Sequence, residues 1–588
     1  MTALAPAERA GSTRGGFASG LLLVCLVAAV YAPSLSLGFA YDDDTLILDR
    51  RMPGSLAEVA RSLVESHWPE QELPYYRPLP GSLLALQRYL HGDRPAPFHA
   101  LNLGLIGVAA LVARGFLRGR AVGVGARAAW LGAALFALHP VAASVVYPIS
   151  GREALLAGIF SVAALQLHLA PRARASRAGA VLLFAAALFT REHALVVPLL
   201  FALADRLGLS ADPPRGARAW LLRQLPLVAV VVLYALLRRS ALLGSATSEL
   251  LQGPRSAWLP LAAPLFALRA SFAPGFLLAY EPRPETWLAT GRTLAGALAG
   301  AGLLAAAAAS ARRDRALRPR LLFLLGFFAL ALLPSANLLR QETEFAERFV
   351  FLPLLPLVGA AALLAERLAA RGSGARRRSL ALLPACAAIG ICAAISVHHA
   401  SWFRDQETFL RRWVESDPGY AKAHFSLGQH WLELGRSAEA RAAFERALEL
   451  DANYPAAHNN LGALAHRRGD VQAARAHWEQ ALALDPDFAY ALNNLAALAV
   501  ERGELDAAAA LYGRSLALSP GNARVHRLLG SLELARGDAE RAREHLERAL
   551  ALDPQVELGR SELERARGAL GRGRARARIP RGGAPAQP

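Results

Sequence analysis

Ionisable side chains gather at the ends of the apolar segments that fill the first 400 residues of the chain. The first of these segments is followed at once by three adjacent aspartates, Asp42, Asp43 and Asp44. A serine or threonine hydroxyl is a poor nucleophile and needs a general base within hydrogen-bond reach, a role that Asp42 or Asp43 can fill. Arginines at other segment ends suit bidentate contacts to phosphate. These residue types fit a reaction that activates a hydroxyl and stabilises a departing phosphate.

The other ionisable motifs are short and occupy the same kind of position. They are His139-Pro140, Gly151-Arg152-Glu153, Arg191-Glu192-His193, and Pro334 to Asn337 running on to Ala346-Glu347-Arg348. Ionisable residues at span ends are costly when they face lipid, so by default they mark a site. The alternative is that they are interfacial caps and ion pairs that lock the ends of the spans. Their clustering on one face of the membrane favours a site.

Composition indicates a membrane protein. Hydrophobic residues make up 54% and charged residues 19% of the 588 residues, against about 25% charged residues in soluble domains. The apolar excess lies before residue 400, which excludes a single soluble domain and a disordered chain. Segments long enough to cross a bilayer lie at 17–39, 99–117, 128–146, 153–170, 221–237, 291–310, 350–368 and 379–397. Shorter segments that would cross only inside a bundle lie at 178–189, 194–206 and 321–333.

Arginine patches predict the orientation, because cytoplasmic loops carry an excess of arginine and lysine. Five patches lie between the apolar segments, at 114–127, 172–177, 206–223, 312–320 and 371–378. Placing them in the cytoplasm with residues 1–16 predicts eleven crossings in a membrane domain over 17–400. The stretch 258–285 then fits an interfacial or re-entrant segment. The loop 40–98 and everything after residue 398 are expected outside the cytoplasm.

Two further features of the composition exclude other classes of protein. The net charge of +18 is explained by these topological arginines, so a nucleic-acid partner is not expected. The three cysteines, Cys25, Cys386 and Cys392, lie in apolar runs without a CxxC motif or a Cys/His cluster. A disulfide framework and a structural zinc site are therefore not expected.

From residue 417 the chain repeats with a period of 34. Turn residues begin each unit at Asp417, Asp451, Asp485, Ser519 and Asp553. Three further positions recur: a leucine at 427, 461, 495 and 529, a glycine at 435, 469, 503 and 537, and an alanine at 440, 474, 508 and 542. This is the tetratricopeptide pattern of paired helices. It predicts four repeats over 417–552, a capping helix over 553–570, and a disordered tail over 571–588 rich in Arg, Gly and Pro.

The repeats predict a binding module. A solenoid of paired helices has a concave face suited to an extended peptide. Asn459-Asn460 and Asn493-Asn494 occupy matching positions in the first helices of successive repeats, where their amides could clamp a peptide backbone. The alternative is that they only solvate that face.

Taken in order, the motifs resemble those of the transmembrane and tetratricopeptide repeat mannosyltransferases. The resemblance rests on the acidic run after the first span, the segment Tyr76 to Leu79, Asn102 in the second span, and the residues 137–153. Arg191-Glu192 and Pro334 to Asn337 with 346–348 extend it over nearly the whole chain. That family belongs to the GT-C glycosyltransferases and is related to protein O-mannosyltransferases.

The resemblance implies an inverting transfer of mannose or another hexose from a polyprenyl-phosphate donor to a protein Ser or Thr hydroxyl, on the non-cytoplasmic side. It favours Asp42 as the base and Asp43 as the residue that orients the acceptor. Because Asp44 is also acidic, the two roles could instead fall one residue further along the chain. Fixed cations would stabilise the phosphate as it leaves. The candidates are Arg152, Arg191, Arg348 and Arg77, supported by Glu153, Glu192, Glu347, Asn102 and Asn337, with His139 or His193 as hydrogen-bond donors to phosphate.

No cofactor beyond the donor substrate is expected, and a divalent metal is not required, although three adjacent aspartates could bind one. The expected partners are a lipid-linked sugar in the membrane and an acceptor polypeptide on the repeats. The expected location is a bacterial inner membrane with periplasmic repeats. Two alternatives remain open: a polyprenyl-sugar transferase that acts on a glycan or lipid, and a non-catalytic membrane scaffold. The sugar, the acceptor and the oligomeric state are not readable from the sequence.

Overall fold

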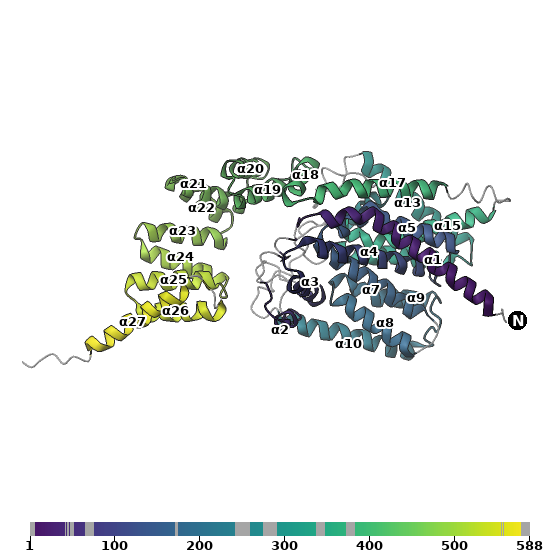
Figure 1. The fold of residues 1–588 in the computed structure, drawn as a ribbon, viewed down its shortest axis with the longest axis horizontal. Helices are drawn as coiled ribbons and strands as arrows, with labels where there is room; N and C mark the ends of the chain where they lie inside the picture. The colour runs from purple at the N-terminus through teal and green to yellow at the C-terminus, as the bar shows by residue number, and fades with distance from the viewer. Residues whose placement is uncertain are drawn as a thin grey trace, which may run out of the picture. The chain divides into compact units, whose positions relative to one another are not determined.

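The chain folds as two helical units, Met1–Ser416 and Asp417–Pro588, drawn in Figure 1. The computed structural model describes residues 6–40, 43, 46–47, 52–64, 76–170, 174–241, 259–273, 291–336, 347–371, 383–553, 556 and 558–577. Within these ranges every regular element is a helix and no strand occurs. The predicted all-α fold, a membrane helix bundle followed by a repeat solenoid, is confirmed.

The long helices of the first unit coincide with the predicted apolar segments. A helix satisfies its own backbone N–H and C=O groups, as a bilayer requires of any segment that crosses it. The α-helices are α1 (Pro6–Tyr31), α2 (Leu56–Arg61), α3 (Pro78–His91), α4 (Pro95–Arg118), α5 (Ala126–Leu138), α6 (Pro140–Val146), α7 (Arg152–Leu169), α8 (Arg174–Leu188), α9 (Val197–Arg206), α10 (Ala217–Ala241), α11 (Leu259–Phe272), α13 (Gly291–Arg313), α14 (Arg318–Leu332), α15 (Phe351–Arg371), α17 (Leu383–Ala400) and α18 (Gln406–Ser416).

The predicted number of spans is wrong. Of the described helices, seven are long and apolar enough to cross a membrane, or eight if a bent pair counts as one span, against the eleven predicted. The segments 178–189, 194–206 and 321–333 fall on α8, α9 and α14, of 15, 10 and 15 residues. At 1.5 Å per residue such helices are about 15–22 Å long, short of a hydrocarbon core of about 30 Å.

The bent pair is the predicted span 128–146. α5 and α6 meet at an angle of 56°, and the break falls at His139-Pro140. Proline at the start of α6 cannot donate a backbone hydrogen bond to the preceding turn, so the first helix ends before it. His139 caps the second helix, because its Nδ1 accepts the backbone N–H of Val141 at 3.2 Å.

Short elements position the ionisable motifs between the long helices. α4 packs against α1, α5 and α7 at the centre of the unit. The turn η3 (Ile149–Gly151) precedes α7, η4 (Glu192–Val196) precedes α9, and η7 (Glu347–Val350) precedes α15. The described part of the predicted outer loop 40–98 includes α2, α3 and the start of α4. α11, from the stretch predicted as interfacial, packs against α13.

The second unit consists of paired helices that follow the 34-residue period. Four pairs form the repeats, and α27 follows them: α19 (Ala421–Glu433) with α20 (Ser437–Leu450), α21 (Pro455–Arg467) with α22 (Val471–Leu484), α23 (Ala489–Glu501) with α24 (Leu505–Leu518), α25 (Ala523–Arg536) with α26 (Ala539–Leu552), and then α27 (Gly559–Ala577).

The recurring small residues explain this pairing. The four turn glycines, Gly435, Gly469, Gly503 and Gly537, have φ between 74° and 84°, which is unfavourable for any residue with a Cβ. The four recurring alanines are fully buried. Gly462 faces the indole of Trp478, where a Cβ would lie 2.5 Å from Nε1. Small residues on one helix therefore admit a large side chain from its partner.

The end of the solenoid differs from the prediction in one respect. α27 packs against α26, as a capping helix should. It continues to Ala577, beyond residue 570 where the tail was expected to begin. Residues 578–588 lie outside the described residues.

Two histidine pairs join the helices of the second and fourth repeats. The Nδ1 atoms of His458 and His477 lie 3.2 Å apart, and those of His526 and His545 lie 3.1 Å apart. A neutral ring donates from one nitrogen only, so each pair shares one proton between its two Nδ1 atoms. The third repeat has leucine at both equivalent positions, Leu492 and Leu511.

We expect acidification to weaken the repeats. Burial lowers the pKa of His458, His477 and His545, neighbouring histidines lower those of His458 and His545 further, and Glu445 partly offsets the effect at His477. The unfolded chain then binds protons first, so stability falls as the pH drops below about 6.5. Hydrogen exchange of repeat peptides in the full chain should be faster at about pH 5.5 than at about pH 7.5, after correction for intrinsic rates. The double variant His477→Leu, His545→Leu should respond less; an equal response would contradict the assignment.

Candidate functional site

Asp43 is fully buried and holds the turn that leads into α7. Its Oδ2 accepts the backbone N–H of Ile149 at 3.1 Å, and its Oδ1 accepts that of Ser150 at 2.9 Å. Backbone N–H groups at a helix start lack partners within the helix, and a carboxylate is favourable there. Asp43 thus fixes the start of the Gly-Arg-Glu motif. Asp42 and Asp44 lie outside the described residues.

Gly151 allows this turn to lie against α6. A Cβ at Gly151 would lie 2.5 Å from the carbonyl oxygen of Val145. Since no side chain fits there, only glycine lets the turn approach so closely. The glycine of the motif is therefore explained by packing, and the arginine after it enters the interior.

Arg152 is buried, with 1% of its surface exposed, and is held by α4. Its Nε donates to Asn102 Oδ1 at 3.0 Å and its Nη2 to the carbonyl of Phe98 at 3.0 Å. The carboxylate of Asp43 interacts electrostatically with this guanidinium group. Arg152 Nη1 has no hydrogen-bond partner among the described residues. A buried donor in that state can take an anionic oxygen or a water molecule.

Asn102 joins this arginine to the turn. Its Nδ2 donates to the carbonyls of Val146 and Pro148 at 3.2 and 3.1 Å, while its Oδ1 accepts from Arg152. The asparagine singled out in the second span therefore supports both the turn and the arginine. Asn337, the other predicted supporting asparagine, lies outside the described residues.

Arg77 bridges the two glutamates of the motifs. Its Nη1 lies 2.5 Å from Glu153 Oε2, and its Nη2 lies 3.1 Å from Glu192 Oε2. Glu192 also accepts the hydroxyl of Tyr234 at 3.1 Å and lies 3.6 Å from Arg238. Burial raises the pKa of Glu192, but Arg77 and Arg238 lower it more, so the net shift is downward and the group is ionised.

The remaining predicted cations surround one aromatic ring. The guanidinium carbons of Arg191 and Arg348 lie 5.0 and 5.7 Å from the ring centroid of Phe349, and the ring of His193 lies 5.3 Å away. Burial lowers the pKa of His193 well below its usual value, and Arg191 and Arg77 lower it further, so this imidazole is neutral. The two arginines therefore lie within cation–π distance of the same ring.

Two predicted residues take other partners. His139 accepts from Val141 through Nδ1, so its Nε2 carries the proton and donates to the carbonyl of Ser271 at 3.1 Å. It therefore links the α5–α6 bend to α11. Glu347 interacts electrostatically with Arg269 of α11.

Sequence reasoning missed four groups that complete this network. Tyr234 and Arg238 lie on α10 and reach Glu192, and Arg269 reaches Glu347. His99 holds the loop before Asp43, because its Nε2 lies 3.1 Å from the carbonyl of Gly38. Arg238 directly follows the apolar segment 221–237 but belongs to none of the five predicted arginine patches, and the others carry no local signal.

No metal centre is apparent in the described part of the chain. Groups of three or more His, Cys, Asp or Glu side chains suited to a metal ion do not occur there. Two of the three adjacent aspartates that could bind a metal, Asp42 and Asp44, lie outside the described residues.

We expect Arg77→Met to destabilise the membrane unit strongly. The substitution keeps the side chain's bulk but leaves the buried Glu153 and the partly buried Glu192 without this cation, and loss of one partner of a buried ion pair typically costs about 3–5 kcal/mol. The yield of monodisperse protein after detergent extraction and its thermal midpoint would measure the loss. Arg367→Met is the control, because it breaks a 2.6 Å pair with Asp314 at an exposed position, where about 0–1 kcal/mol is usual. Equal stability of both variants would refute the bridging role.

Three of the four predicted asparagines form a chain of amide hydrogen bonds. Asn494 Nδ2 donates to Asn459 Oδ1 at 2.8 Å, between successive repeats, and Asn459 Nδ2 donates to Asn460 Oδ1 at 3.3 Å. Among the described residues, no hydrogen-bond partner is found for the other amide atoms of the chain, Asn460 Nδ2 and Asn494 Oδ1. Asn493 Oδ1 is buried without one, and position 528, which matches Asn494 in the next repeat, is a leucine. Asn459 thus stabilises repeat stacking, and one donor and one acceptor remain for a ligand.

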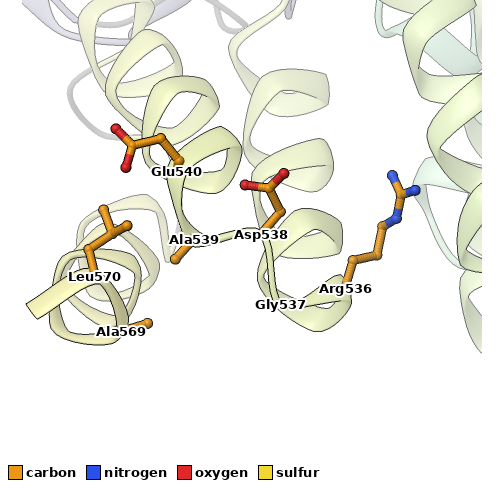
Figure 2. Close-up of a pocket in the computed structure, with 7 residues that line it drawn as sticks. All are labelled: Arg536, Gly537, Asp538, Ala539, Glu540, Ala569 and Leu570. Atoms are coloured by element: carbon orange, nitrogen blue, oxygen red, sulfur yellow. The ribbon is translucent and has the colours of Figure 1, made fainter. Parts of the chain in front are cut away.

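A shallow pocket of about 610 Å³ lies at the last repeat, apart from all predicted site residues. Figure 2 shows it between the turn from α25 to α26 and the side chains of Ala569 and Leu570 on α27. Arg536 at its edge forms salt bridges with Asp506 and Glu533, at 2.5 and 3.0 Å. Asp538 caps α26 by accepting the backbone N–H of Arg541. These contacts explain the charged residues of the pocket without a ligand.

Comparison with known proteins decides the nature of the second half. Segments 407–458, 443–476, 465–532 and 499–570 each match the tetratricopeptide repeat family. The second unit is therefore built of tetratricopeptide repeats. The repeat region is also similar to the protein O-mannosyl-transferase TMTC3 of Mus musculus, with 30% identity over 148 residues, and of Homo sapiens, with 29%. The match covers 24% of this chain and 16% of each relative. It supports the resemblance to the transmembrane and tetratricopeptide repeat mannosyltransferases.

Solved structures with similar tetratricopeptide repeats include the MamA protein, with 22% identity over 25% of this chain and 81% of that one, at a TM-score of 0.22. YrrB, described as a TPR protein with an unusual peptide-binding site, has 22% identity over 26% of this chain and 79% of its own, at a TM-score of 0.22. A mutant of the Thermobaculum terrenum O-GlcNAc transferase has 36% identity over 20% of this chain and 22% of its own, at a TM-score of 0.19.

Proposed function

We propose that the chain is a membrane glycosyltransferase. It would move mannose or another hexose from a polyprenyl-phosphate donor to a Ser or Thr hydroxyl of a protein. One observation carries the proposal: two sets of ionisable and amide side chains, Asp43 with Asn102 and Arg152, and Arg77 with Glu153 and Glu192, meet at the start of α7, where Arg152 and Glu153 are consecutive. These residues come from separate segments of the sequence. Charged groups are costly in a membrane domain, and a purely structural scaffold has no need to gather them.

The residues suit an inverting displacement. The acceptor hydroxyl would attack C1 of the sugar as the bond from C1 to the phosphate oxygen breaks. Asp42, one residue before the anchored Asp43, would take the hydroxyl proton, and the phosphate would leave with the bonding electron pair. Arg152, with an Nη1 available, and the cations around Phe349 would stabilise the growing negative charge. Asp43 would act through the turn it holds and not by touching the acceptor.

We place the acidic run and the repeats together on the non-cytoplasmic side, as the arginine patches predict. Reporter fusions at about residue 90 and about residue 450 should both give the exported signal. The expectation for the repeats requires an odd number of crossings, which seven described spans would give and eight would not, and the two fusions test each position directly. A cytoplasmic signal from either fusion would end the shared-side mechanism.

The decisive experiment is mass spectrometry of the exported proteome from cells with and without the gene. Loss of hexose from Ser and Thr of one or more proteins would support the proposal. Loss of a lipid-linked or polymeric glycan with unchanged proteins would favour the polyprenyl-sugar transferase that acts on a glycan or lipid. An unchanged glycome would leave the repeat scaffold as the function.

A further inference from the structure

The loop that leads to Asp43 is attached to a distant part of the membrane unit. The backbone N–H of Gly38 donates to the carbonyl of Arg404 at 3.0 Å, and the carbonyl of Gly38 accepts from His99 Nε2. A Cβ at Gly38 would lie 3.2 Å from the oxygen of Arg404. The loop is therefore clamped between α4 and the segment that follows α17.

The turn on the other side of Asp43 is attached to the end of α17 and to the segment that follows it. Tyr147 lies two residues before Ile149, whose N–H binds Asp43. Its hydroxyl donates to the carbonyl of Ser396 at 2.7 Å, and its ring centroid lies 5.8 Å from that of Phe403. Tyr147 is fully buried, so its hydrogen bond is not exchanged for one with water.

The segment itself is well fixed. Ser396 Oγ donates to the carbonyl of Leu138 at 2.9 Å. The ring of Phe403 stacks at 5.4 Å on Phe409 of α18. Asp405 Oδ1 accepts the backbone N–H of Thr408 at 2.8 Å and so caps the first turn of α18. α18 ends at Ser416, immediately before the first residue of the second unit.

We infer that residues 396–404 are a positioning element for the Asp43 site, with Gly38 and Tyr147 as its two points of attachment. Both backbone segments that meet at Asp43 are held by this one stretch of chain. Neither Gly38 nor Tyr147 touches the reacting atoms of the proposed transfer; each acts through the loop or turn that it holds. The element's effect on sugar transfer rests on the proposed function, whereas its effect on the local stability of the loop and the turn does not.

The effect on local stability is tested by local hydrogen exchange in the full-length chain. Tyr147→Phe keeps the ring and removes only the hydroxyl bond to Ser396. We expect exchange of the Ile149 and Ser150 amides to become faster by about fivefold, the effect of losing one typical hydrogen bond. Gly38→Ala should speed exchange at residues 37–40 in the same way. Gly104→Ala on α4 is the control, because a Cβ there meets nothing within 4 Å.

The effect on sugar transfer is tested by separating the two Michaelis constants. Because the 149–151 turn leads into Arg152, Tyr147→Phe should raise the KM for the polyprenyl-phosphate sugar about fivefold and leave the KM for a short acceptor peptide unchanged. A general loss of folded enzyme would lower the maximal rate and change neither KM.

The outcomes separate the two proposals. Unchanged exchange in both Tyr147→Phe and Gly38→Ala, or an equal increase in Gly104→Ala, would overturn the positioning role. Faster exchange in a chain whose wild type transfers no sugar would keep the positioning role and reject the transferase. Faster exchange with unchanged donor KM would show that the segment holds Asp43 without affecting donor binding, and would overturn the catalytic part of the inference.

Discussion

Asp42→Asn is expected to lower sugar transfer by about 10²–10⁴-fold, the usual cost of removing a general base. The amide has nearly the shape of the carboxylate but cannot take the acceptor's proton at neutral pH. Transfer from a polyprenyl-phosphate hexose to a Ser-containing peptide, measured in detergent or nanodiscs, would give the rate. The amount of folded protein should stay at the wild-type value, because the proposed role of Asp42 is chemical.

Asp43→Asn is the matched control at the next position. Its wild-type carboxylate accepts backbone N–H groups through both oxygens, and an amide retains only one acceptor oxygen. The expected result is a loss of stability of about 1.5–3 kcal/mol, as for a hydrogen bond to a charged group. Wild-type transfer in Asp42→Asn together with an inactive but stable Asp43→Asn would move the base to Asp43. Full activity in both variants would reject acid–base catalysis by this run.

The sequence predicted the elements better than it predicted their ends. Apolar composition located all the long helices, because burial in lipid constrains every residue of a span. It also separated the segments 178–189 and 194–206 at Arg191–His193, but it counted them as crossings, whereas α8 and α9 have only 15 and 10 residues. Pro198 in the first turn of α9 marks this boundary. The excess of predicted crossings arose at such breaks.

The site was predicted as a set of residues but not as a set of pairs. Arg-Glu motifs suggest that each glutamate holds a nearby arginine, yet Glu153 and Glu192 both bind Arg77. These partners are 76 and 115 residues apart in the chain. Such pairing depends on how η4, α3 and α7 pack, and one sequence alone carries no signal for it. The same reason explains why Tyr234 and Arg238 were missed.

The repeats were predicted more completely, since their interactions are local. Each pair of helices contacts mainly its neighbours, so a 34-residue pattern of glycine, alanine and leucine defines both the helices and their packing. The Asn459–Asn494 bond was not foreseen, although the period places these residues in successive repeats. Side chains 35 residues apart also meet at two other places, where His466 lies 2.9 Å from Glu501 and Arg527 lies 3.2 Å from Glu562 of α27.

Deletion of residues 417–577 is expected to remove acceptor selection while leaving the chemical step. A polypeptide held on the repeats has a raised effective concentration at the membrane site. This can increase the rate of transfer by about 10²-fold or more without a new catalytic contact. Transfer to a long or folded acceptor should therefore fall by about that factor. A short Ser-containing peptide at high concentration should be modified at a rate close to that of the full chain.

Asn460→Ala is the sharper test of how the acceptor is held. Its Nδ2 is not engaged by any described residue, whereas Asn494 also stabilises repeat stacking through Asn459, so its loss would affect both binding and fold. Asn460→Ala should raise the KM for the long acceptor by about tenfold, the cost of about 1.4 kcal/mol of binding, and leave the short peptide unaffected. Asn453→Ala, at an exposed turn before α21, should change neither. Equal losses for short and long acceptors on deletion of the repeats would mean that they support the fold of the membrane unit, and that recruitment is not their role.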